Sequence, residues 1–207
     1  MSEAALARGV DALGLALRKP QIERLERYLD LLEKWNRVYN LTAIRERDQM
    51  VTHHLLDSLA ILPYVKGPRV LDVGSGAGLP GIPLALGNLT LDVTLLEANQ
   101  KKAAFLRQAV AELALANAAV ETQRVESWKA PTQFDTIVSR AFAELRQFVA
   151  STGRLLAPGG MLLAMKGTYP RDELGHLPPG YRVKTTVRLD VPLIGAERHL
   201  VLIEAVP

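Results

Sequence analysis

The 207-residue sequence contains no cysteine, which excludes disulfide bridges, zinc–thiolate centres and cysteine nucleophiles. Aromatic residues make up 5% of the chain, so aliphatic side chains must fill most of its core. No stretch approaches the roughly 18 consecutive apolar residues that a membrane-spanning helix needs. The first residues include Glu3 and Arg8, which interrupt the apolar run expected of a signal peptide. These absences predict a cytoplasmic protein with no segment in a membrane.

The charge balance is mildly basic, with a net charge of +3 at pH 7 and a pI of about 9.3. Hydrophobic residues make up 48% and charged residues 23%, which is ordinary for a globular protein with a sizeable core. The basic charge permits a polyanionic partner such as nucleic acid without requiring one. Arginine exceeds lysine, which weakly favours phosphate and guanine contacts, although codon bias in a GC-rich genome gives the same preference.

Residues 1–64 are expected to form a helical N-terminal extension that packs on a second unit, residues 65–207. One helix is predicted to begin at Pro20, because proline suits the first turn of a helix. Its apolar residues recur at spacings of three and four and predict one buried stripe: Ile22, Leu25, Leu29, Leu32, Trp35 and Tyr39. A further helix is predicted from Asp48, as its N-cap, to Leu62.

From Arg69 onward, short apolar runs alternate with helical stretches, which predicts a mostly parallel sheet with helices on both faces. The expected strands are Val70–Val73, Leu91–Leu96, Ala119–Val125, Thr136–Ser139 and Met161–Met165, with helices at Gln100–Leu115 and Glu144–Leu156. Two further strands, Tyr181–Leu189 and His199–Val206, follow without a helix between them and predict an antiparallel hairpin. The pattern predicts an α/β, Rossmann-like, seven-stranded sheet with a C-terminal hairpin, the layout of a class I S-adenosylmethionine-dependent methyltransferase.

The segment Val70–Gly78 places an acid and three glycines directly after the first strand: Asp72, Gly74, Gly76 and Gly78. Glycines at these positions allow a sharp turn and a close approach of the backbone to a ligand. The helix expected near Leu79 points its N–H groups at the same place. Asp72 is expected to meet an ammonium group, directly or through water, which suits an amino-acid moiety better than a pyrophosphate.

The residues Gly76–Gly81 also match the dinucleotide fingerprint G-x-G-x-x-G, which indicates a nicotinamide-dependent oxidoreductase as an alternative. The match is weak, because another glycine and an acid precede it and Pro80 lies inside it. The hairpin at the end of the chain also favours the methyltransferase.

Acidic residues end the second and third predicted strands. Glu97 is placed to accept hydrogen bonds from both hydroxyls of a ribose, as in either class of enzyme. Val125 and Glu126 are expected beside an adenine ring, with a solvated loop acid as the plain alternative for Glu126.

The fourth strand ends in Ser139-Arg140-Ala141-Phe142, without the Asn/Asp-Pro-Pro-aromatic tetrapeptide typical of exocyclic-amine methyltransferases. Arg140 is a candidate partner for a cofactor carboxylate or an RNA phosphate, or forms a surface ion pair. Lys166, at the tip of the fifth strand, points toward the same crevice or lies in solvent. Both are candidate positioning groups, and no catalytic base is expected.

Two adjacent histidines, His53 and His54, point in different directions on a helix and cannot chelate one ion well. We therefore expect no metal site, and a structural or RNA-facing role for the pair.

At this point the chain resembles a known family, the bacterial ribosomal RNA small subunit methyltransferase G, also called glucose-inhibited division protein B. The resemblance covers nearly the whole chain. It rests on Lys34–Asn36, Tyr39–Thr42, His54–Ser58, Asp72–Pro83, Phe105–Arg107, Ser139–Phe142, Lys166–Gly167 and Glu197–Leu200.

The resemblance implies S-adenosylmethionine-dependent N7-methylation of a guanine in the 530 loop of 16S rRNA. It also implies cofactor contacts at Gly74, Leu79, Glu97, Val125–Glu126 and Arg140. His53 stands where many relatives are expected to have arginine, which puts only a peripheral RNA contact in doubt.

The expected partner is 16S rRNA, either free or in a small-subunit assembly intermediate, and the chain is expected to be a monomer. The candidate RNA-binding residues are Arg45, Arg47, His53, Lys101, Lys102, Arg107 and Arg198. A non-catalytic RNA-binding or assembly factor is the remaining alternative.

Overall fold

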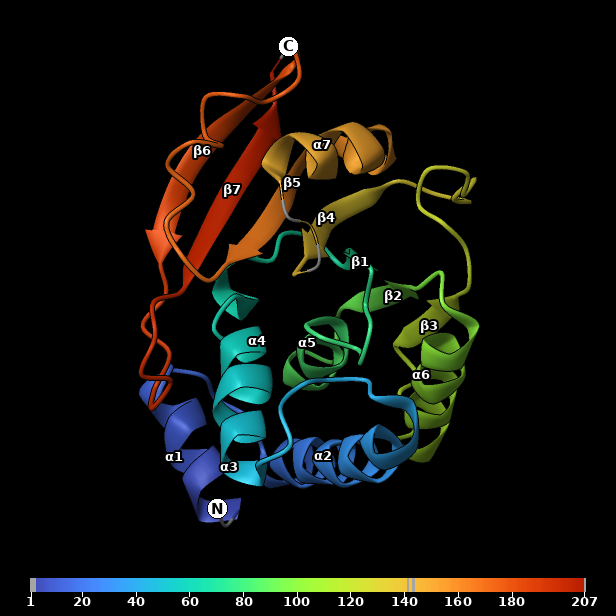
Figure 1. Ribbon diagram of the computed structural model, residues 1–207, viewed down its shortest axis with the longest axis vertical. Helices are drawn as coiled ribbons and strands as arrows, with labels where there is room; N and C mark the ends of the chain where they lie inside the picture. Colours follow the sequence, from blue (N-terminus) through green and yellow to red (C-terminus); the bar gives the residue numbers. More distant parts are fainter. Residues whose placement is uncertain (1–2, 141, 143, 207) are drawn as a thin grey trace.

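The computed structural model describes residues 3–140, 142 and 144–206 and forms a seven-stranded sheet in the order β3-β2-β1-β4-β5-β7-β6 (Figure 1). Ala141, part of the Ser139–Phe142 motif, lies outside the described residues. The strands are β1 (Arg69–Val73), β2 (Asp92–Leu96), β3 (Ala118–Glu121), β4 (Phe134–Ser139), β5 (Leu156–Lys166), β6 (Tyr181–Arg188) and β7 (His199–Ala205). The first five strands pair in parallel, and β7 pairs antiparallel with both β5 and β6. The α/β fold and the C-terminal hairpin predicted from the sequence are confirmed.

The N-terminal helices α1 (Glu3–Ala12) and α2 (Lys19–Tyr39) are followed by α3 (Arg47–Met50), the π-helix η1 (Val51–Leu56), α4 (Asp57–Leu59) and the 3-10 turn η2 (Leu62–Tyr64). The predicted N-cap at Asp48 is wrong: α3 begins at Arg47, and Glu46 precedes it without a side-chain cap. The predicted end of the third strand is also wrong, since β3 ends at Glu121 and the chain bends away before Val125.

Helices α5 (Gly81–Gly87) and α6 (Gln100–Glu112) cover one face of the sheet, and α7 (Leu145–Thr152), which continues into the 3-10 turn η3 (Gly153–Leu155), covers the other. Alternation along β1 explains this division, because Val70 packs with the α5–α6 face whereas Leu71 and Val73 pack with α7. In the described part of the chain, no helix combines the length and the apolar character needed to cross a membrane.

Helix α2 runs across the ends of α5 and α6 (Figure 1) and shares one hydrophobic core with them. Polar side chains of α2 reinforce this packing through the last carbonyls of both helices. Gln21 Nε2 donates to Leu86 O, in the last turn of α5, at 2.6 Å, and Arg24 Nε donates to Leu113 O, at the C-cap of α6, at 3.0 Å. The last carbonyls of a helix have no hydrogen-bond donor within the helix, and the side chains of α2 supply donors for these two.

Candidate functional site

The loop after β1 contains three glycines with positive φ: Gly74 at 70°, Gly76 at 57° and Gly78 at 88°. A Cβ at Gly78 would overlap the side chain of Ile82, so this glycine is required by packing inside the protein. A Cβ at Gly76 would meet no described atom closer than the carbonyl oxygen of Gly74, 3.8 Å away. Of these two glycines, Gly76 therefore opens toward space that a ligand could fill, and Gly78 does not.

Asp72 supports this loop from inside the protein and does not line a cavity. Its side chain is fully buried, and Oδ2 accepts the backbone N–H of Gly81 at 2.9 Å. Its Oδ1 has no hydrogen-bond partner among the described residues. Burial raises the pKa of Asp72 to about 7. In this geometry the carboxyl group fixes the start of α5, and the expected contact of Asp72 with an ammonium group, directly or through water, stays a prediction.

Glu97, at the end of β2, faces the glycine loop and is 8% exposed. Its Oε2 accepts the N–H of Gly76 and its Oε1 accepts the N–H of Asn99, each at 2.8 Å. A carboxylate oxygen can accept a second hydrogen bond, so both oxygens retain capacity for a ligand hydroxyl. Asn99 in turn caps α6 through Lys101 N, which fixes the turn after β2.

A cavity of about 360 Å³, here called the Glu97 cavity, lies at the carboxyl ends of β1 and β2. It brings together Gly74, Glu97, Val125 and Glu126, four of the residues expected to bind a cofactor. Val125 is buried and Glu126 exposed, both on the segment after β3. The full lining is Val73, Gly74, Leu96, Glu97, Ala98, Gln123, Arg124, Val125, Glu126, Phe142 and Gln147.

The remaining expected cofactor residues are not among this lining, although Gly76 donates its N–H to Glu97 beside it. Leu79 is buried in the core beside the glycine loop, and Asp72 and Gly78 act in the packing described above. Sequence reasoning missed Tyr28 of α2, whose buried hydroxyl donates to Ala77 O at 2.7 Å. Burial raises the pKa of Tyr28, so the hydroxyl stays protonated and keeps donating. Helix α2 thus holds the glycine loop through this buried hydrogen bond.

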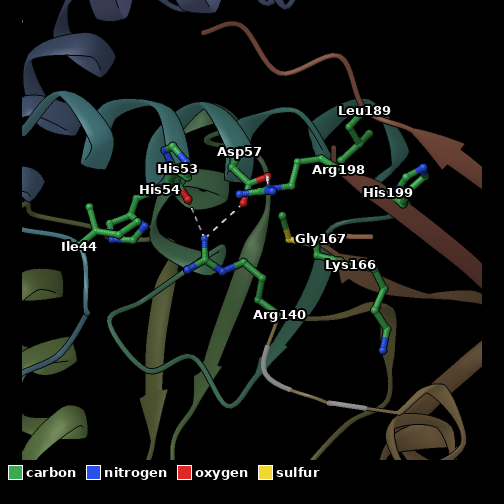
Figure 2. Close-up of a pocket in the computed structure, with 11 residues that line it drawn as sticks. Ile44, His53, His54, Asp57, Arg140, Lys166, Gly167, Leu189, Arg198 and His199 are labelled. Carbon is green, nitrogen blue, oxygen red and sulfur yellow. Dashed lines mark hydrogen bonds and ion pairs between the residues drawn. The ribbon is translucent and has the colours of Figure 1, made fainter. Parts of the chain in front are cut away.

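A second cavity, of about 260 Å³, lies beyond the end of β4 and is here called the Arg140 cavity (Figure 2). Arg140 Nη1 donates to His53 O at 3.0 Å and pairs with Asp57 Oδ2 at 3.4 Å. Arg198 Nε, from the segment before β7, pairs with Asp57 Oδ1 at 3.1 Å. The lining residues are Ile44, His53, His54, Asp57, Arg140, Met165, Lys166, Gly167, Leu189, Arg198 and His199.

The two cavities flank the segment that follows β4, because Arg140 lines one and Phe142 the other. Arg140 faces η1 in Figure 2 and is not among the residues that line the Glu97 cavity. Asp57 lies in the His54–Ser58 segment that carries the family resemblance, but the sequence analysis gave it no role of its own. The signal that could have indicated a role was an acidic residue inside the otherwise mostly apolar segment Leu55–Leu62.

The two histidines differ in their environments. His54 is buried, and its Nε2 lies 2.9 Å from Thr42 Oγ1. Burial lowers the pKa of His54 to about 4, and Arg140 acts in the same direction, so the ring is neutral at pH 7. His53 is half-buried at the rim, with Nδ1 2.8 Å from Thr52 Oγ1.

Lys166 lines the Arg140 cavity, but its ammonium group points away from Arg140 (Figure 2). Nζ donates to Glu173 Oε2 at 2.8 Å, and the same oxygen accepts the N–H of Leu145 at the start of α7. The lysine therefore lines the crevice as expected and also links β5 to α7 through Glu173, while its role as a positioning group stays a prediction.

One candidate RNA-binding residue, Arg47, is paired with acids, and its RNA contact stays a prediction. Arg47 lies among three acids of α2: Glu26 Oε2 and Asp30 Oδ1, each at 2.6 Å, and Glu33 Oε1 at 3.2 Å. Burial opposes the charge of Arg47, but these ion pairs outweigh that effect and raise its pKa. Its charge is neutralised locally, so it adds little attraction for a polyanion.

The other candidate cations remain accessible. Arg45 and Arg107 are exposed and donate to neutral oxygens, of Asn40 and Thr122 respectively. Lys101 is exposed and Lys102 half-buried in the first turn of α6, and Arg198 lies in the Arg140 cavity.

The strand order and the inserted antiparallel β7 define the fold of class I S-adenosylmethionine-dependent methyltransferases. The glycopeptide N-methyltransferase MtfA, in complex with S-adenosyl-L-methionine, matches with a TM-score of 0.59 and 18% identity over 74% of this chain and 95% of that one. TrmN from Thermus thermophilus matches with a TM-score of 0.55 and 20% identity over 76% of this chain and 49% of that one.

The family model for rRNA small subunit methyltransferase G, GidB, matches residues 21–201. Proteins named ribosomal RNA small subunit methyltransferase G are 54% identical in Aromatoleum aromaticum, over 99% of both chains, and 53% identical in Laribacter hongkongensis, over 95% of both. The chain belongs to the rRNA small subunit methyltransferase G family, which confirms the resemblance seen in the sequence and displaces the oxidoreductase alternative.

Proposed function

We propose that this chain transfers a methyl group from S-adenosylmethionine to N7 of a guanine in the 530 loop of 16S rRNA. Family membership supports the rRNA substrate, and the N7 position and the 530 loop follow from the family resemblance. The observation that carries the proposal is the pair of cavities on either side of the segment after β4. One is suited to an adenosine ligand and the other is lined by arginines.

The residues around the Glu97 cavity fit S-adenosylmethionine. Glu97 has acceptor capacity for the ribose hydroxyls, and Gly76 leaves its open side beside this carboxylate. Val125 provides an apolar surface for the adenine ring, with Glu126 at its exposed edge. Gly74 lines the cavity at the end of β1, where the backbone can approach the amino-acid part of the ligand.

The bound cofactor supplies an electrophilic methyl group, and the protein has to bring the acceptor nitrogen into line with it. Guanine N7 has an in-plane lone pair and no proton at neutral pH, so no base is needed to activate it. The neutral, Thr42-bonded His54 and the arginine-paired Asp57 agree with a site that orients the acceptor and excludes water. Arg140 and Lys166 then contact the cofactor carboxylate, guanine O6 or phosphate, but not N7.

We propose that the RNA approaches over the exposed cations Arg45, Lys101 and Arg107 and the half-buried Lys102, Arg198 and His53. The substrate is 16S rRNA, either free or in a small-subunit assembly intermediate, and the chain acts as a monomer in the cytoplasm. Residues 1–64 form an extension that packs on the methyltransferase domain, residues 65–207.

The test is transfer of label from methyl-tritiated S-adenosylmethionine to unmethylated 16S rRNA, assembly intermediates and mature small subunits. Replacing the target guanine by 7-deazaguanine should abolish transfer while leaving RNA binding largely intact. The single-turnover rate should be nearly flat between about pH 6.5 and 9, because no base is titrated. A rate that rises tenfold per pH unit, when chemistry limits it, would exclude N7 as the acceptor. RNA binding without any transfer would favour the non-catalytic assembly factor.

A further inference from the structure

Asp57 is a buried carboxylate held between two arginines from distant parts of the chain (Figure 2). Its side chain is 5% exposed, and each of its oxygens faces one guanidinium: Oδ2 faces Arg140 and Oδ1 faces Arg198. Burial raises the pKa of Asp57, although both arginines oppose the rise. Removing a carboxylate from water is costly unless ion pairs and hydrogen bonds compensate, so the geometry of the pairs matters.

The local backbone also sets the position of this carboxylate. Asp57 directly follows the π-helix η1, and His53 O in the same helix accepts a hydrogen bond from Arg140 at 3.0 Å. Single π-helical turns are rare and occur frequently at functional sites. Here the turn presents the His53 carbonyl and the Asp57 carboxylate together at one wall of the Arg140 cavity.

Arg198 lines the cavity, and only some of its donors bond to the described residues. Nε pairs with Asp57, and Nη1 donates to Glu197 O at 2.8 Å. Nη2 has no hydrogen bond to the described residues. The guanidinium is planar, so fixing Nε and Nη1 also fixes the direction in which Nη2 points.

We propose that Asp57 is a positioning residue for RNA: it holds Arg198 so that Nη2 donates to a phosphate of the target nucleotide. This inference rests on the proposed function. Two guanidiniums and one carboxylate give this cluster a net charge of +1, which matches one phosphate, and the nearby Lys166 is paired with Glu173. A phosphate is favoured over the guanine edge, because an arginine donor at N7 would occupy the lone pair that must be methylated.

The decisive variant is Asp57→Asn. If Asp57 positions Arg198, this variant should bind RNA more weakly, whereas if Asp57 acts only through its negative charge, the variant should bind RNA more tightly. Removing a carboxylate next to a polyanion should tighten RNA binding if only charge matters. If Asp57 positions Arg198, the variant should instead bind about tenfold more weakly, as for the loss of one charge-assisted contact. The slope of log affinity against log salt should also fall in magnitude by about 0.7–0.9.

Affinity and single-turnover rate are measured at saturating S-adenosylmethionine, on the unmethylated 16S rRNA or subunit that the wild-type chain binds. Arg198→Gln should reproduce the losses of Asp57→Asn, and the double variant should be no worse than either single variant. Asp135→Asn is the matched control, because Asp135 pairs with Arg69 at 2.7 Å at the opposite, amino-terminal edge of the sheet. It should leave RNA affinity and the salt slope unchanged.

A second variant keeps the test decisive if Asp57→Asn does not fold. Arg198→Lys retains the positive charge but has a single nitrogen. If that ammonium group pairs with Asp57, no second nitrogen is left to contact a phosphate. This variant should therefore lose as much RNA affinity as Arg198→Gln. The proposal is overturned if Asp57→Asn binds RNA as tightly as wild type with an unchanged slope, if the double variant's losses multiply, or if Arg198→Lys binds normally. RNA binding by wild type without methyl transfer would refute the proposed chemistry and leave this inference standing.

Discussion

Substituting Gly76 and Gly78 separately by alanine tests whether the glycine loop surrounds a cofactor. Both residues have positive φ, so either alanine costs about 1–2 kcal/mol of backbone strain. At Gly78 the new Cβ would also overlap Ile82, which adds about 1–3 kcal/mol of overpacking. We therefore expect Gly78→Ala to lower the free energy of unfolding by about 2–5 kcal/mol, and Gly76→Ala by about 1–2 kcal/mol.

For ligand binding, Gly76→Ala should have the larger effect and Gly78→Ala the smaller one. The Cβ of Gly76→Ala meets open space in the protein but would meet the cofactor, so binding of S-adenosylhomocysteine should weaken by more than about tenfold. The folded fraction of Gly78→Ala should bind nearly as well as wild type, because its Cβ points into the core. Urea unfolding gives the stabilities and calorimetry the affinities. Wild-type binding by Gly76→Ala, or greater destabilisation at Gly76 than at Gly78, would refute the placement of the site.

Four further results are expected. Glu97→Ala should weaken cofactor binding by about 1–3 kcal/mol, and a 2′-deoxy analogue should then lose less than it does with wild type; equal losses would remove Glu97 from the ribose. Tyr28→Phe should lower the free energy of unfolding by about 1–3 kcal/mol, because it leaves a buried loop carbonyl without its donor, and an unchanged urea midpoint would contradict this. Because the pKa of Asp72 is raised from 3.8 to about 7 on folding, the folded state binds the extra proton, and this residue's contribution to stability is present below pH 4 and lost as the pH rises to 7. As the pH rises from 4 to 8, the free energy of unfolding of Asp72→Asn should therefore increase by up to about 4 kcal/mol relative to that of wild type. If the difference in free energy of unfolding between variant and wild type does not change with pH, the pKa of Asp72 is not raised on folding. Finally, Arg45→Gln should weaken binding of 16S rRNA and reduce its salt dependence, whereas Arg47→Gln should lower stability with little effect on the salt slope, and the opposite pattern would place Arg47 on the RNA surface.

The sequence predicted most reliably what depends on local pattern. The alternating strands and helices predicted the parallel sheet, and the acid at the end of β2 predicted Glu97 at the rim of a cavity. The glycine motif located the loop, but pattern alone could not distinguish Gly76 from Gly78. That distinction depends on Ile82, whose position is set only when α5 packs on the sheet.

Charged residues were harder to assign, because their partners are distant in sequence. Arg47 looked like an accessible cation, yet its three acidic partners lie 14–21 residues earlier on α2. Asp57 carried no assigned role, since Arg140 and Arg198 follow it by 83 and 141 residues. In both cases, the tertiary fold decides whether a charge faces solvent or another charge.

The N-terminal extension is more than a support for the sheet, because it supplies one wall of the proposed target site. Ile44, His53, His54 and Asp57 all precede the first strand and line the cavity together with Arg140, which contacts His53 and Asp57 directly. The same extension supplies Tyr28, which holds the glycine loop of the other cavity. A sheet domain beginning at residue 65 would keep Glu97 but lose the acid that pairs with both arginines. The boundary read from the sequence therefore separates two patterns of secondary structure, whereas the proposed chemistry lies where the two parts meet.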